Sequence, residues 1–110
     1  MDHTSDPQAV RFTFDASRVD LAREFRDKTD GHYSADLHRL LMRMRWGPTA
    51  GRYVLVVEEP GRLWKLGQLP QDRGQKVRVF DIEFTSLANA EWHVFKLRWQ
   101  ELAGAPLVMD

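Results

Sequence analysis

The stretch FTSLANAEWHVFKLRWQEL, residues 84–102, has the residue spacing of a long helix with two apolar faces. At about 100° per residue, one face collects Ala88, Trp92, Phe95, Trp99 and Leu102, and a second face collects Leu87, Ala90, Val94 and Leu97. A surface helix needs one buried face, so two apolar faces predict neighbours on two sides. Either both faces lie in one small core, or one face meets a second polypeptide, which is the interpretation we favour.

Two tryptophans seven residues apart on the same face are the reason for this preference. Their side chains are large relative to the core that a chain of this size can build, and tryptophan is enriched where interfaces draw their binding energy. We therefore predict a partner interface on this face of the long helix and on the second predicted helix. Its residues are Trp92, Phe95, Trp99, Leu102, Met42 and Trp46.

Three strands are expected before the long helix. The segment 52–58, RYVLVVE, has five consecutive apolar residues, which predicts a strand covered on both faces. Pro60 and Gly61 stand where a type II turn needs them, so a hairpin leads into a second strand over 63–69. A third strand is expected over 77–84, with a bulge near Val79 and Phe80, where the apolar alternation shifts phase.

Two helices are expected before the strands. Ser17 with Asp20 has the spacing of a capping box for the first helix, and Ser34 is placed to cap the second, where Leu37, Leu40, Leu41 and Met44 follow helical spacing. The predicted fold is therefore a small single α+β domain, with two N-terminal helices, a three-stranded antiparallel meander and a long C-terminal helix packed on the sheet.

The composition is that of one small folded domain. The 110 residues are 43% hydrophobic, Lys plus Arg equals Asp plus Glu at 16 each, and cysteine is absent. Balanced charge creates no field for nucleic acid or an anionic membrane, and the first ten residues lack the features of a signal peptide. We expect a cytoplasmic protein with no membrane attachment, in which residues 1–9 are a loose terminus and residues 10–110 are one domain.

No group of residues in the sequence predicts a catalytic or metal site. The four histidines, His3, His32, His38 and His93, have no second histidine or carboxylate at a recognised ligand spacing. No nucleophile elbow is present, and the glycines of residues 47–51 lack the lysine and the following helix of a phosphate loop. We expect no catalytic residue and no cofactor in this chain.

A basic helix followed by a hairpin gives one alternative function. Arg39, Arg43 and Arg45 surround the apolar face of the second helix, and the hairpin carries further cations. Two helices and a hairpin are also the order of a winged-helix DNA-binding regulator. Acidic residues dilute this patch and the net charge is zero, so nucleic-acid binding is the second choice.

Two stretches resemble the small (alpha) subunit of N,N-dimethylformamidase. The first is LHRLLMRMRWGPTAGRY, residues 37–53, in which Pro-Thr-x-Gly-Arg-Tyr leads into a strand. The second is the long helix and its start, where the matching positions are Phe84, Ser86, Ala90, Val94, Phe95 and Arg98. Trp64 in the hairpin also fits, so the resemblance spans 37–102.

The resemblance implies an accessory role in a complex. In that family a small subunit pairs with a large one, and the complex hydrolyses N,N-dimethylformamide to dimethylamine and formate. The active site, with a mononuclear iron held by tyrosine and glutamate side chains, belongs to the large subunit, so no catalytic residue carries over. The chain is shorter at its N-terminus than the family norm. This leaves three partners open: a true dimethylformamidase, a related amidohydrolase, or another copy of the chain in a homo-oligomer.

Overall fold

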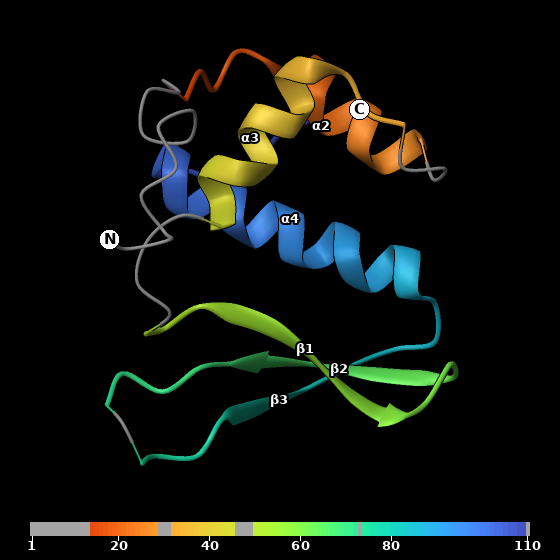
Figure 1. Ribbon diagram of the computed structural model, residues 1–110, viewed down its shortest axis with the longest axis vertical. Coiled ribbons are helices and arrows are strands. Elements are labelled where there is room, and N and C mark those ends of the chain that lie inside the picture. Colours follow the sequence, from red (N-terminus) through yellow and green to blue (C-terminus); the bar gives the residue numbers. More distant parts are fainter. Residues whose placement is uncertain (1–13, 29–31, 46–49, 73, 110) are drawn as a thin grey trace. The chain divides into compact units, whose positions relative to one another are not determined.

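The computed structural model describes residues 14–28, 32–45, 50–72 and 74–109. These residues form three helices and three strands, which are labelled in Figure 1: α2 (Val19–Asp27), α3 (Ala35–Arg45), β1 (Tyr53–Glu59), β2 (Leu63–Gln68), β3 (Arg78–Phe84) and α4 (Leu87–Ala103). The strands form one antiparallel sheet in the order β1–β2–β3. This is the α+β meander with a long closing helix that the sequence predicts.

The described residues belong to two units. The helical unit takes its described residues from 14–45 and 99–109, and the sheet unit takes them from 50–98. Helix α4 runs through both, because its residues 87–98 belong to the sheet unit and residues 99–103 to the helical unit. One domain over residues 10–110 stays a prediction, and residues 1–9 lie outside the described part of the chain.

Leucines at helical spacing form the interior of the helical unit. Leu21 of α2 and Leu37 and Leu40 of α3 are each at most 4% exposed. Trp99, from the last part of α4, is 2% exposed, and its ring meets that of Phe14 edge to face, with centroids 4.9 Å apart. Aromatic pairs in this geometry stabilise a core beyond the area they bury.

The two predicted caps of the first helices have different outcomes. Ser34 caps α3 as predicted, because its Oγ accepts the Leu37 N–H at 3.2 Å. The capping box at Ser17 is wrong: α2 begins one residue later, after Arg18, with no side-chain cap. The reason is Asp15, whose Oδ1 accepts both the Ser17 N–H at 2.9 Å and its hydroxyl at 2.6 Å, a local bond that competes with capping.

Two turns of the sheet unit depend on glycines with a positive φ, Gly51 and Gly61. Gly61 has a φ of 74°, and the Arg62 N–H donates to the Glu59 carbonyl at 2.9 Å, as the predicted turn requires. Gly51 has a φ of 76°, its N–H donates to the Leu69 carbonyl, and its own carbonyl accepts from the Gln68 side chain. The glycine of the Pro-Thr-x-Gly stretch is therefore needed for the left-handed backbone that starts β1.

The register assigns each strand residue to one of two faces. One face carries two cross-strand rows of side chains, Tyr53–Gln68–Arg78 and Val57–Trp64–Phe84. The other face carries the rows Val54–Gly67–Val79 and Val56–Lys65–Glu83. The pairing of β2 with β3 shifts between Lys65 and Gly67, opposite residues 79–83, which confirms the predicted irregularity.

Helix α4 lies on the face of the sheet that carries Phe84. The His93 ring is 5.2 Å from the Phe84 ring, and Arg98 donates a hydrogen bond to the Tyr53 carbonyl at 3.1 Å. At the start of α4, Ser86 Oγ accepts the Asn89 N–H at 3.3 Å, so this serine caps the helix. Figure 1 shows the helix along one side of the sheet.

Helix α4 lies on the face of β1 that carries Tyr53 and Val57. Residues 53–56 of the strand are half-buried, so Val54 and Val56 on the second face keep accessible surface. No described element of the sheet unit lies on that second face, and the cover of β1 on both faces stays a prediction.

Candidate functional site

Ionisable side chains in the described part of the chain do not gather into a metal centre. There, no three residues of the types His, Cys, Asp and Glu lie close enough together to hold a metal ion. Burial lowers the pKa of His93, and the nearby Lys96 lowers it further. Its ring packs on Phe84, so His93 serves as a largely uncharged packing residue at neutral pH.

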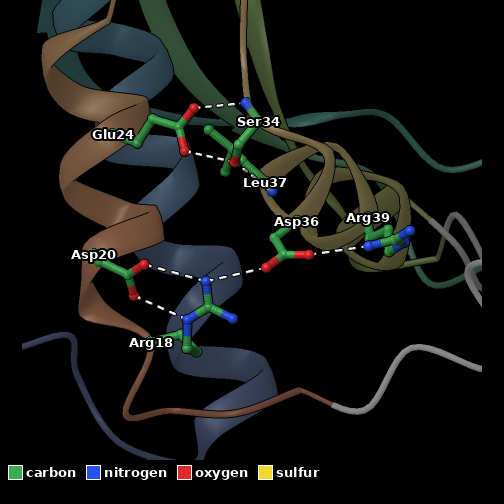
Figure 2. A network of polar contacts seen from close by, with 7 residues as sticks. All are labelled: Arg18, Asp20, Glu24, Ser34, Asp36, Leu37 and Arg39. Carbon is green, nitrogen blue, oxygen red and sulfur yellow. Dashed lines mark hydrogen bonds and ion pairs between the residues drawn. The ribbon is translucent and has the colours of Figure 1, made fainter.

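An ion-pair network joins α2 to α3 inside the helical unit (Figure 2). Arg18 donates through Nε to Asp20 at 3.0 Å and through Nη2 to Asp36 at 3.2 Å. Asp36 also accepts from Arg39 at 2.9 Å. Hydrogen bonds to Asp20, then to Asp36, raise the pKa of Arg18 above its usual value. These side chains are about half exposed, so each pair adds little to the stability of the fold.

A carboxylate of α2 fixes the first turn of α3, as Figure 2 also shows. Glu24 accepts the Ser34 N–H at 2.6 Å and the Ser34 hydroxyl at 2.7 Å. The same hydroxyl oxygen accepts the Leu37 N–H at 3.2 Å. The bonds from the Ser34 backbone, then from its side chain, hold the pKa of Glu24 below its usual value. Glu24 is therefore a structural residue that orients a helix cap.

A cavity of about 200 Å³ opens beside this network in the helical unit. Its lining combines aromatic and aliphatic side chains with three charged ones: Phe14, Asp15, Arg18, Leu21, Asp36, Leu40 and Trp99. The charged groups bond protein partners, since Asp15 accepts from Ser17 and Arg18 donates to Asp36. The lining therefore identifies no class of ligand.

The predicted interface residues on α4 divide into buried and accessible ones. Phe95 and Trp99 are each 2% exposed in the single chain. Trp92 is half-buried; its ring stacks on Phe95 with centroids 5.5 Å apart, and the Lys96 ammonium lies 5.7 Å from its ring centre. Leu102 of α4 is also half-buried.

Two further predicted interface residues come from α3 and the segment after it. Met42 of α3 is half-buried, and Trp46 lies outside the described residues. Of the six predicted residues, Trp92, Leu102 and Met42 thus have accessible surface within the described part of the chain. An interface at these six positions stays a prediction.

The uncovered face of the sheet was missed as a candidate surface by the sequence reasoning. It consists of Val54 and Val56 of β1, Gly67 and Lys65 of β2, and Val79 and Glu83 of β3, and we call it the valine face. The signal was present in the five consecutive apolar residues of β1, because such a strand is apolar on both sides. Only the register shows which residues of β2 and β3 complete the face.

The cations of the basic helix and hairpin are partly neutralised. Arg39 pairs with Asp36 at 2.9 Å in α3, and Lys65 pairs with Glu58 at 3.8 Å in the hairpin. Helix α3 and the hairpin also belong to different units. Nothing in the described structure favours the DNA-binding alternative. Among the described helices, none has the length and apolar character needed to cross a membrane.

Comparison with known protein families identifies a match. The family model of the N,N-dimethylformamidase alpha subunit matches residues 9–107 of the 110-residue chain. No curated protein sequence matches the chain. The family match takes in the resemblance noted for residues 37–102 and extends it across the helical and sheet units. The chain belongs to the N,N-dimethylformamidase alpha subunit family.

Proposed function

We propose that this chain is the non-catalytic small subunit of a dimethylformamidase-like amidohydrolase complex. Its role is to bind and stabilise a large, iron-bearing catalytic subunit, which hydrolyses N,N-dimethylformamide to dimethylamine and formate. The observation that carries the proposal is the family match over residues 9–107, because an alpha subunit implies a complex of more than one chain. We place the complex in the cytoplasm.

The roles found for the ionisable side chains support an accessory function. Glu24 bonds Ser34, Arg18 bridges two helices, and His93 packs on Phe84. Each is engaged in holding the fold together, so we assign no catalytic residue and no metal ligand to this chain. The iron and the reacting groups are placed in the large subunit.

The accessible members of the predicted interface support contact with a partner. Trp92 stacks on Phe95, so its ring is held in place before any partner binds, and aromatic anchors of this kind often carry binding energy. We propose that Trp92, Leu102 and Met42 contribute to the interface with the large subunit. A second copy of this chain is the alternative occupant.

Purified components test the proposal directly. A large catalytic chain of a dimethylformamidase is produced alone and together with this chain, and dimethylamine release from N,N-dimethylformamide is measured. We expect a stable complex whose activity outlasts that of the large chain on heating, and no turnover by the small chain alone. Turnover by the purified small chain, or about one iron per small chain by elemental analysis, would contradict the proposal.

A further inference from the structure

The valine face carries valines on both of its outer strands, β1 and β3. Val54, Gly67 and Val79 form one row across the three strands. A Cβ built on Gly67 would lie 2.8 Å from a Val56 methyl and 3.4 Å from a Val54 methyl. The two valines therefore close over the glycine, which is buried although its face carries no helix. A larger residue at Gly67 would separate these methyl groups and roughen the surface.

The same face is accessible in the whole chain. Val79 is 47% exposed, and Val77, which precedes β3, is 41% exposed. Helix α4 occupies the opposite face through His93 and Arg98, and no other described element of the sheet unit is available to cover the valines. Apolar β-branched residues gathered on an open sheet face are typical of a contact surface.

Charged residues border the valine face at the hairpin end of the sheet. Lys65 lies between Glu58, at 3.8 Å, and its cross-strand partner Glu83. Three carboxylates and two cations occupy this end of the three strands: Glu58, Glu59, Glu83, Arg62 and Lys65. The border is therefore acidic, and a complementary surface would carry Lys or Arg around an apolar centre.

The size of the face decides between a second copy and a larger partner. Three strands about 4.8 Å apart and about seven residues long present on the order of 300 Å². A specific interface of standard size needs about 800 Å² from each partner. A symmetric pair formed through this face alone would therefore be too small, and the shared acidic border would oppose it. A different, larger polypeptide can cover the valines as part of a wider contact.

We propose that the valine face docks against the large subunit, on an apolar patch bordered by basic side chains. This inference rests on the proposed function and adds the surface that serves it. It also explains why β1 is apolar on both sides although α4 covers only one: the second side is buried in the complex.

Charged substitutions on the face test the proposal. Val79→Glu and Val56→Lys each place a charge on the valine face, and Val108→Glu is the matched control, since Val108 is 83% exposed in the helical unit. Each variant is produced together with the large catalytic chain used to test the proposed function, and complex formation is measured by sedimentation. Circular dichroism of each isolated variant checks that it folds.

The result expected is a loss of affinity of at least about tenfold for both face variants and none for Val108→Glu. Folded face variants that bind like the unmodified chain would overturn the valine face as the docking surface while leaving the proposed function intact. If the unmodified chain forms no complex with the large chain, the proposed function fails, and this inference fails with it.

A second copy of the chain is the remaining occupant to exclude. Sedimentation of the isolated chain at about 100 µM is expected to show no dimer that Val79→Glu or Val56→Lys abolishes. A dimer abolished by both variants and kept in Val108→Glu would show that the valine face pairs with itself, and would overturn the large subunit as its partner.

Discussion

Glu24 connects α2 to the first turn of α3 through a single serine. Its carboxylate accepts two hydrogen bonds from Ser34, and Ser34 in turn accepts the Leu37 N–H. Glu24→Gln removes the charge and one of the two acceptor oxygens. We expect this variant to lower the free energy of unfolding at pH 7 by about 1 kcal/mol, the value of a typical hydrogen bond.

The pH dependence of this difference has a definite sign. Hydrogen bonds from Ser34 hold the pKa of Glu24 below its usual value of 4.5, so the folded state favours the ionised form. The stabilisation is therefore complete above about pH 4.5 and is lost as the pH falls through the lower, folded pKa. Denaturant unfolding followed by circular dichroism should show the difference between Glu24→Gln and the unmodified chain shrinking below pH 4.5.

Glu59→Gln is the matched control for this measurement. Glu59 is exposed at the end of β1, and no hydrogen bond or ion pair of its side chain is found among the described residues. The control should match the unmodified chain at pH 7. A Glu24→Gln difference that stayed constant from pH 7 to pH 3 would show that the carboxylate charge does not support the cap.

Serine caps show what could and could not be predicted at the scale of single residues. Ser34 caps α3 as the sequence predicts, and Ser86 caps α4. Ser17 does not, because Asp15 binds its hydroxyl and its N–H first. The role of Glu24 was beyond prediction, because it lies ten residues from Ser34 and meets it only once both helices are packed.

Helix α4 carries two tryptophans whose roles can be distinguished by substitution. Trp99 is 2% exposed and packs edge to face on Phe14, so Trp99→Ala should cost about 3–5 kcal/mol and unfold the helical unit. Trp92 is half-buried, so Trp92→Ala should cost less than about 2 kcal/mol and keep the fold. Circular dichroism and thermal unfolding measure both effects.

Assembly is the second measurement on the same pair of variants. If Trp92 belongs to the interface, Trp92→Ala weakens the complex with the large chain in sedimentation while its spectrum stays native. Unfolding of both variants would place the whole apolar face in the core of the chain. A folded Trp92→Ala variant that assembles normally would remove this residue from the interface.

Periodicity predicted where the elements lie better than what each face meets. The spacing of α4 indicated two apolar faces, and Ala90, Val94, Phe95 and Trp99 are indeed buried. The spacing alone could not show that Trp99 contacts Phe14 and belongs to the helical unit. The apolar run of β1 likewise indicated two sides to cover, but the valine face depends on strand register, which no local pattern determines.

The charge of the whole molecule leads to a prediction about nucleic acid. Sixteen cations are balanced by sixteen carboxylates, and Arg39 and Lys65 are in ion pairs with Asp36 and Glu58. Affinity for DNA depends largely on phosphate contacts that release counterions, and a neutral chain with paired cations offers few. We expect fluorescence anisotropy at about 150 mM salt to show no binding of duplex DNA tighter than about 100 µM.

Two substitutions make this measurement specific to the basic helix. Arg39→Ala and Arg43→Ala should change nothing if α3 takes no part in DNA binding, and lowering the salt should produce only weak binding without sequence preference. Submicromolar, salt-sensitive binding to a defined sequence, abolished by both substitutions, would instead support the winged-helix alternative. The accessory role in an amidohydrolase complex would then need separate proof, because a chain that reads DNA through α3 has a function the family match does not imply.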